Sequence, residues 1–305
     1  MPSLSQKLHA RQFVVTTELT PPKGIDLAEL LQKADALKGV VDAINLTESP
    51  RARMAVEPTA VGKLLLDRGI EPIVQFTTRD RNRIALQADL LGAALLGITN
   101  VVFMMGDDPR NGDHAEAKAV HDLTTLDLLR TARGLNAGHD LSGSPLKGAP
   151  SLFIGATANP AAADFNREIE NVKRKIDAGA QFLQTQAVYE AEVLIRFIEA
   201  LGADVAVLAG IIPLKSARMA QWLNANVPGI RVPDALIGKM AAVSGDADAE
   251  LKTSIELSAR TIRALRPHCA GVHLMTIGWE QHIPAILSAA KEESAEAAKT
   301  AQKKV

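Results

Sequence analysis

Residues 72–106 read PIVQFTTRDRNRIALQADLLGAALLGITNVVFMMG, and the pattern of this stretch indicates the fold class. Two short runs rich in β-branched and aromatic residues, Pro72–Thr78 and Asn100–Gly106, enclose a longer segment with helical periodicity, Arg83–Leu96. Gly97, in AALLGI, stands where a helix turns out through the left-handed region. A strand, a helix and a second strand in this order predict a βαβ unit in a parallel sheet.

The same alternation continues in both directions along the chain. Further strands are predicted at Phe13–Leu19, Val41–Thr47, Ser151–Ala158, Phe182–Val188, Val205–Ile211 and Gly271–Gly278. Further helices are predicted at Leu27–Lys38, Thr59–Arg68, Thr124–Leu135, Ala161–Ala178, Glu190–Ala203 and Ala217–Asn226, with a short helix within 226–241 and a longer one at Asp246–Arg266. About eight strands, almost all followed by a helix, predict an α/β fold, the (β/α)8 TIM barrel. We expect a single domain over residues 1–305, with extended βα loops, a core at about 13–293 and a charged tail at 294–305.

The composition describes a well-packed protein without a strong charge. Of the 305 residues, 47% are hydrophobic, and 34 Lys and Arg against 35 Asp and Glu give a formal net charge of −1. This balance creates no field that would gather nucleic acid or an anionic membrane, which favours a small-molecule partner. The N-terminal stretch lacks the apolar core of a secretory signal, and the longest uncharged run, Leu90–Gly106, is too short to cross a bilayer. We therefore expect a cytoplasmic protein.

Several classes of site are disfavoured by motifs that the sequence lacks. The single cysteine, Cys269, can form neither an internal disulfide nor a cysteine-based zinc site, and we expect it to pack in the interior. The histidines are scattered without HxH or HExxH spacing, so no metal is expected. GxGxxG does not follow the first strand, and GxSxG is absent, which argues against a Rossmann cofactor site and an esterase.

In a barrel of this kind, the chemistry lies at the C-terminal ends of the strands. Those ends carry Glu18, Thr20, Asn45, Thr47, Gln75, Thr77, Thr78, Gly106, Asp107, Asp108, Thr157, Asn159, Thr185, Gln186 and Thr276. Most of these groups are neutral amides and hydroxyls, and few are carboxylates. Such a ring suits a large heteroaromatic ligand better than a metal ion.

Two of the carboxylates could carry chemistry. Glu18 ends the first strand, where partial desolvation would raise its pKa and make it a general acid; alternatively, an arginine or a backbone N–H satisfies it. Asp107 follows Gly106 and could face an electron-poor ring; alternatively, it stabilises its loop as an Asx-turn. We expect its neighbour Asp108 to be solvated.

A basic helix offers an anion site. Asn171, Arg174 and Lys175 fall within helical reach of one another and could grip a phosphate, or they could form a solvated face. Thr185 and Gln186 could hydrogen-bond the edge of a pterin or nicotinamide, or the glutamine could join neighbouring strands.

The segment TTRDRNR at residues 77–83 allows two interpretations. Asp80 or Asn82 could cap the following helix, or Arg79 and Arg81 could bind an anion. The sequence alone leaves both open.

Seven strings occur in order along the chain: TELTPPKG, VDAINLTES, TTRDRNRIALQ, MMGDDPRNGDH, VKRKIDAGAQFLQTQAVYE, AGIIPLKSA and GVHLMTIGWE. Together they resemble the methylenetetrahydrofolate reductase family, especially its short bacterial type, from about Phe13 to Ile283. The resemblance implies a barrel that holds a flavin across its C-terminal mouth. The flavin would be FAD, with FMN possible, and NADH or NADPH would be the co-substrate.

Roles follow from the resemblance position by position. Glu18 matches the general acid, Asp107 matches the acid beside the flavin and the folate pterin, and Gln186 matches a residue that meets the pterin or nicotinamide. The flavin-contacting positions also include Thr47, Gln75, Gly106, Glu168, Asn171, Arg174 and Lys175.

Three positions depart from the family pattern. Met105 stands where some members have an arginine that contacts the flavin, and Ala217 replaces an aromatic residue that stacks on ligand. Trp279 replaces an arginine that helps to hold the folate tail. We expect Lys215 and Arg218 to take over that last role.

The resulting hypothesis is a ping-pong reduction of 5,10-methylenetetrahydrofolate to 5-methyltetrahydrofolate by NAD(P)H through a flavin, with Glu18 as the acid. Two alternatives are a flavin-bearing subunit that needs a partner protein for electron input, and a non-redox barrel lyase or aldolase that uses Lys175. We expect a folate substrate and a homo-oligomer.

Overall fold

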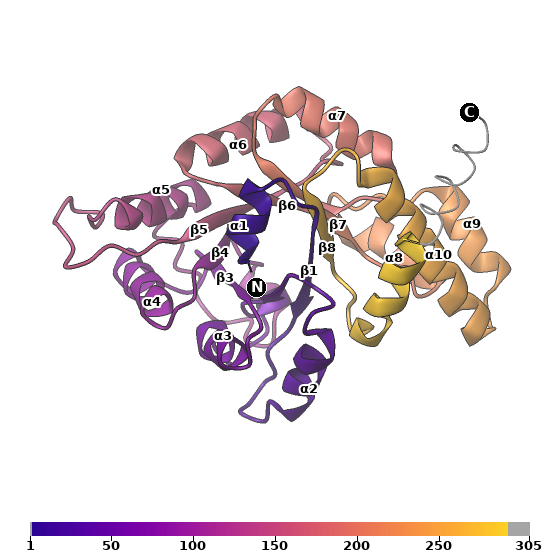
Figure 1. The fold of residues 1–305 in the computed structure, drawn as a ribbon, viewed down its shortest axis with the longest axis horizontal. Helices are drawn as coiled ribbons and strands as arrows, with labels where there is room; N and C mark the ends of the chain where they lie inside the picture. The colour runs from indigo at the N-terminus through magenta and orange to yellow at the C-terminus, as the bar shows by residue number, and fades with distance from the viewer. Residues whose placement is uncertain (1, 292–305) are drawn as a thin grey trace.

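The computed structural model describes residues 2–291, and at its centre lies a closed barrel of parallel strands (Figure 1). The strands are β1 (Val14–Leu19), β2 (Ala43–Leu46), β3 (Pro72–Thr77), β4 (Asn100–Met104), β5 (Phe153–Ala158), β6 (Phe182–Ala187), β7 (Ala206–Ile211) and β8 (Gly271–Leu274). Each strand pairs with the next along the chain, and β1 also pairs with β8, from Val14 beside Gly271 to Thr17 beside Leu274. The predicted (β/α)8 barrel is confirmed.

Helices cover the outside of the barrel (Figure 1). The helices after β1 to β6 are α2 (Ala28–Leu37), α3 (Pro58–Asp67), α4 (Arg83–Leu95), α5 (Thr125–Asn136), α6 (Phe165–Ala178) and α7 (Ala191–Leu201). After β7 come α8 (Ala217–Asn226), α9 (Asp234–Ala242) and α10 (Ala247–Leu265), and residues 283–291 are helical after β8. Short 3₁₀ turns are η1 (Pro50–Ala52), η2 (Pro109–Asn111) and η3 (Glu280–His282).

The predicted element boundaries are too wide at several ends. Helix α6 begins at Phe165 rather than Ala161, because the Asp164 carboxylate accepts the Arg167 N–H at 3.0 Å and starts the helix there. Strand β8 ends at Leu274, four residues before the predicted end. The predicted charged tail at 294–305 lies outside the described residues.

The first helix, α1 (Leu4–His9), was not predicted and lies across the N-terminal end of the barrel (Figure 1). Ser3 and Gln6 form a capping box at its start, which is the sequence signal that identifies it. Leu4 and Leu8 are buried and belong to one apolar cluster with Val14 and other residues of the barrel interior. The helix therefore closes the end opposite the strand C-termini.

Side chains inside the barrel alternate with side chains under the helices, as the pleat of a strand requires. The apolar interior cluster includes Val14, Ile73, Val102, Phe153, Phe182 and Leu208. The rings of Phe153 and Phe182 stack at 4.9 Å, and a Cβ on Gly155 would lie 2.4 Å from Cζ of Phe182. Residues two and four positions further along the strands therefore face the interior nearer to the mouth.

None of the helices within the described part of the chain is both long and apolar enough to span a bilayer.

Candidate active site

The C-terminal ends of the strands bring the predicted carboxylates to one end of the barrel. Glu18 lies four residues after Val14 on β1, and Asp107 follows β4 beyond Gly106. Because all the strands are parallel, both residues lie at the mouth of the barrel. A ligand seated over the mouth can thus meet an acid from the first βα unit and another from the fourth.

Glu18 faces the imidazole of His273. Glu18 Oε2 lies 3.6 Å from His273 Nε2, and their side chains are 24% and 4% exposed. His273 Nδ1 lies 2.9 Å from Oγ1 of Thr16, on the same strand as Glu18. A cavity of about 350 Å³ opens beside Glu18, lined also by Thr20, Pro22, Lys33, Ile277 and Glu280 among others. No sequence motif singles out His273, but its place on β8 beside Thr16 puts it inside the barrel.

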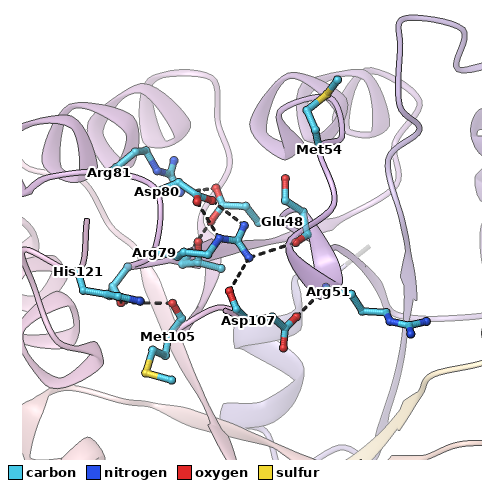
Figure 2. Close-up of polar contacts among 12 residues, drawn as sticks. Glu48, Arg51, Met54, Arg79, Asp80, Arg81, Met105, Asp107 and His121 are labelled. Atoms are coloured by element: carbon cyan, nitrogen blue, oxygen red, sulfur yellow. Dashed lines mark hydrogen bonds and ion pairs between the residues drawn. The ribbon is translucent and has the colours of Figure 1, made fainter. Parts of the chain in front are cut away.

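Asp107 is exposed at the start of the loop after β4. Its Oδ2 accepts the backbone N–H of Arg51 at 2.6 Å, and its carbonyl oxygen accepts Nη1 of Arg79 at 3.3 Å (Figure 2). The Asx-turn belongs to the next residue instead, since Asp108 accepts the Arg110 N–H at 2.9 Å. The Arg110 guanidinium lowers the pKa of Asp108 to about 2. Asp107 thus remains available at the mouth, while Asp108 shapes the loop.

Buried neutral groups lie between these two acids. Thr47 is buried, and its hydroxyl donates to Oγ1 of Thr20 at 3.1 Å. Gln75 is 8% exposed, and its side chain has no hydrogen-bond partner within residues 2–291. The buried hydroxyl of Thr77 on the same strand also has no partner there. Unpaired buried polar atoms are rare in proteins, so the Thr77 hydroxyl, together with the unpaired and partly accessible Gln75 amide, points to a ligand with matching donors and acceptors.

An amide pair crosses the barrel below these groups. Asn45 Nδ2 donates to Oε1 of Gln184 at 2.7 Å, and Gln184 Nε2 returns a hydrogen bond to Oδ1 of Asn45 at 3.1 Å. Strands β2 and β6 lie on different sides of the barrel, so the pair forms a polar floor under the mouth. Gln186, at the end of β6, turns back so that its Oε1 accepts the Ala187 N–H at 3.1 Å.

The basic helix α6 does not present its three predicted residues as one cluster. Lys175 is buried, and its Nζ donates to the carbonyl oxygen of Thr157 at the end of β5, at 2.6 Å. Burial lowers the pKa of Lys175, and the nearby Glu168 carboxylate opposes this shift. Asn171 is half-buried and donates to Glu168 at 3.3 Å, whereas Arg174 is exposed. Adjacent helical positions point about 100° apart, so Arg174 and Lys175 diverge.

The two residues expected to hold a folate tail lie in different surroundings. Lys215 Nζ donates to the carbonyl oxygen of Ile277 and lies 5.2 Å from the centre of the Trp279 ring. Burial lowers the pKa of Lys215, with an opposing effect from Glu280. Arg218, on the first turn of α8, is exposed.

The TTRDRNR segment is occupied by internal contacts. Asn82 caps α4 by accepting the N–H groups of Ile84 and Ala85, so the capping interpretation is confirmed for Asn82 and not for Asp80. Arg79 pairs with Asp80, and Arg81 pairs with Glu48 and Asp89. Neither arginine is left free for an anion.

Metal ligands are not gathered at the mouth. Within residues 2–291, no group of three or more His, Cys, Asp or Glu side chains is arranged to hold a metal ion. A cavity of about 610 Å³ lies at the other end of the barrel, beside Leu8, Phe13 and Ala270. Since the polar strand ends are not there, we place the site at the C-terminal mouth.

The chain is similar in sequence to methylenetetrahydrofolate reductases from a bacterium, a worm and a yeast. The chain is 24% identical over 261 residues to the 5,10-methylenetetrahydrofolate reductase of Pectobacterium carotovorum, covering 82% of this chain and 80% of that protein. It is 24% identical over 300 residues to the probable methylenetetrahydrofolate reductase (NADPH) of Caenorhabditis elegans, and 25% identical over 202 residues to methylenetetrahydrofolate reductase 2 of Schizosaccharomyces pombe. These matches cover 93% and 63% of this chain, but only 43% and 31% of the worm and yeast proteins.

A solved structure shares the fold. An uncharacterized protein from Clostridium thermocellum that binds two copies of 5-methyl-5,6,7,8-tetrahydrofolic acid superposes with a TM-score of 0.60 at 16% identity. The superposition covers 96% of this chain and 99% of that one. Residues 3–291 match the family described as methylenetetrahydrofolate reductase, which is nearly the whole described chain. The chain therefore belongs to the methylenetetrahydrofolate reductase family.

Proposed function

We propose that this protein reduces 5,10-methylenetetrahydrofolate to 5-methyltetrahydrofolate with NADH or NADPH, using a bound flavin. The observation that carries the proposal is the placement of Glu18 and Asp107 at one mouth, above buried polar groups of which Gln75 and Thr77 lack partners. The family match over residues 3–291 supports the same reaction.

The residues present fit a flavin. The unpaired amide of Gln75 and the hydroxyl of Thr77 can hydrogen-bond the polar edge of an isoalloxazine ring. The buried ammonium group of Lys175 can bind the phosphates of the flavin. The residues proposed to hold the cofactor are Thr47, Gln75, Gly106, Asp107, Glu168, Asn171, Arg174 and Lys175. FAD is the proposed form. A bound flavin would supply the hydride transfer, which no side chain can perform.

The chain's own residues would handle protons and charge. Glu18 donates a proton to a folate amine nitrogen as the five-membered ring of the substrate opens, leaving a cationic iminium group on the folate. The carboxylate of Asp107 stabilises that positive charge from the other side of the mouth. Gln186 would hydrogen-bond the pterin, while Lys215 and Arg218 would attract the carboxylates of the folate tail.

One second candidate rests on a structural observation. Burial lowers the pKa of Lys175, as a Schiff-base lysine in a lyase or aldolase would require. However, its Nζ donates to the Thr157 carbonyl oxygen. Borohydride trapping with a carbonyl substrate would support this candidate.

Purified protein tests the proposal directly. We expect a yellow protein whose released chromophore has the mass of FAD, and oxidation of NADH or NADPH that depends on 5,10-methylenetetrahydrofolate. A yellow protein that oxidises neither nucleotide alone would favour the subunit that needs an electron-donating partner. A colourless protein that does not take up added flavin would contradict the proposal.

A further inference from the structure

Arg79 is a buried guanidinium between the two loops that border the mouth. Its side chain is 3% exposed. On one side, Nε and Nη2 donate to the Asp80 carboxylate at 2.7 and 2.6 Å. On the other side, Nη1 lies 3.3 Å from the carbonyl oxygen of Asp107 and 3.4 Å from that of Ser49 (Figure 2). One planar group thus joins the β2–α3 loop, the β3–α4 turn and the β4–α5 loop.

The backbone of Arg79 also contacts the β4–α5 loop. Its carbonyl oxygen accepts the N–H of Val120 at 2.6 Å, near the end of the β4–α5 loop. At the start of that loop, Gly106 has φ +88°, and a Cβ there would lie 3.0 Å from Cβ of Arg79. Arg79 therefore contacts the loop that carries Asp107 near both of its ends.

These contacts fix Asp107 at two points. Its carbonyl oxygen is held by Arg79, and its Oδ2 is held by the N–H of Arg51. Oδ1 has no hydrogen bond in the described part of the chain. Arg51 and Ser49 have φ of 58° and 42°, which non-glycine residues keep only when their surroundings hold them there. The arrangement leaves one carboxylate oxygen of Asp107 free while the other is held.

We infer that Arg79 is a positioning residue that sets the direction of the Asp107 carboxylate by holding the backbone of residues 49 and 107. The inference rests on the proposed function, in which Asp107 meets the bound substrate. Arg79 itself is too deeply buried to contact a ligand at the mouth. Met105 cannot position Asp107 in this way, because its side chain is uncharged and 64% exposed.

Hydrogen exchange tests the inference without any turnover. In Arg79→Gln, we expect amides in the peptide 49–56, which include the Arg51 N–H, to exchange about tenfold faster, as loss of one hydrogen bond allows. Arg79→Lys should behave similarly, because an ammonium cannot reproduce the planar fork. Arg130→Gln is the control: it removes an arginine–aspartate pair that lies within α5 and involves none of these loops. Unchanged exchange in Arg79→Gln, or wild-type exchange in Arg79→Lys, would overturn the inference.

A double-mutant cycle tests the consequence for the reaction. Arg79→Gln should lower kcat/KM for the folate substrate by about tenfold in the wild-type background, and less than about twofold in Asp107→Asn, because both changes affect one group. Additive losses would overturn the inference. If Arg79→Gln does not fold, Asp80→Asn replaces it, since that change removes the partner that aims the guanidinium. Absence of folate reduction in the wild type would refute the proposed function, and the exchange experiment would still decide the role of Arg79.

Discussion

Glu18 Oε2 lies 3.6 Å from Nε2 of His273, and the two side chains meet inside the barrel from the neighbouring strands β1 and β8. The imidazole is oriented by the Thr16 hydroxyl, 2.9 Å from Nδ1. Thr16 and His273 are both buried, whereas Glu18 is partly exposed toward the mouth. The carboxyl group is therefore placed by a buried network but remains within reach of a bound substrate.

The first prediction concerns the proton that Glu18 would donate. Glu18→Gln should lower folate turnover by about 10² to 10⁴, the range for a lost general acid, and leave flavin reduction by NAD(P)H nearly intact. Stopped-flow measurement of the two half-reactions separates these effects. Glu29→Gln is the control, because Glu29 lines the same cavity but is 82% exposed and pairs with Lys33. Equal losses in both half-reactions would refute the assignment.

The second prediction separates the basic residues of α6. Lys175→Met should weaken flavin binding by roughly 10- to 100-fold, as expected for loss of a hydrogen bond from a charged group. Lys173→Met, on the exposed side of the same helix, should leave it unchanged. Titration of the apoprotein with FAD, followed by flavin fluorescence, measures both. Similar losses in the two variants would mean that only the overall charge of the helix matters.

The third prediction concerns backbone conformation at the mouth. Gly106→Ala should destabilise the protein by about 1–3 kcal/mol, because alanine at a positive φ is strained and its Cβ would crowd Arg79 and Thr77. Gly92→Ala, in the interior of α4 with nothing within 4 Å of the new Cβ, should instead stabilise it by about 0.5–1 kcal/mol. Urea unfolding gives both values, and a stabilising Gly106→Ala would contradict the observed loop geometry.

The fourth prediction concerns the amide pair across the barrel. Gln184→Leu should cost about 1–3 kcal/mol, because it leaves the buried Asn45 amide without a partner. The double variant Asn45→Leu with Gln184→Leu should cost less than the sum of the single changes. Chemical denaturation of the three variants gives the coupling energy. A coupling near zero would show that the two amides do not depend on each other.

The fifth prediction concerns pH and Cys269. Burial raises the pKa of this thiol to about 11, and its sulfur lies 3.2 Å from the carbonyl oxygens of Leu265 and Gly271. Since the thiolate is the reactive form, alkylation by iodoacetamide should be slow at pH 8 and rise about tenfold per pH unit up to pH 10. Urea-unfolded protein is the control. Alkylation of the folded protein at pH 8 as fast as that of the unfolded chain would contradict a packing role.

The fold was predictable because hydrophobic periodicity is a local property. The runs Pro72–Thr78 and Asn100–Gly106 with a helix between them already contain one repeat of the barrel, and the other strands follow the same pattern. Helix α1 was missed because six residues are too few for periodicity to show, although its capping box is visible in Ser3 and Gln6.

The sequence predicted that Glu18, Thr47 and Gln75 lie at strand ends on one side of the barrel, because the last residues of parallel strands lie at the same edge of a sheet. The sequence did not predict which of their polar atoms lack a hydrogen-bond partner. Gln184 and Asn45 lie 139 positions apart and satisfy each other, whereas Gln75 finds no partner within residues 2–291. The divergence of Arg174 from Lys175 likewise depends on which face of α6 packs against the barrel.

The sequence by itself determined the order of strands and helices, the end of the barrel that carries polar groups, and the family to which those groups belong. These follow from side chains close together along the chain. Only the tertiary structure decided that His273 meets Glu18, that Arg79 holds the loop of Asp107, and that Lys175 turns inward to Thr157. Such contacts join residues that are distant in sequence, and barrel closure and helix packing set their geometry.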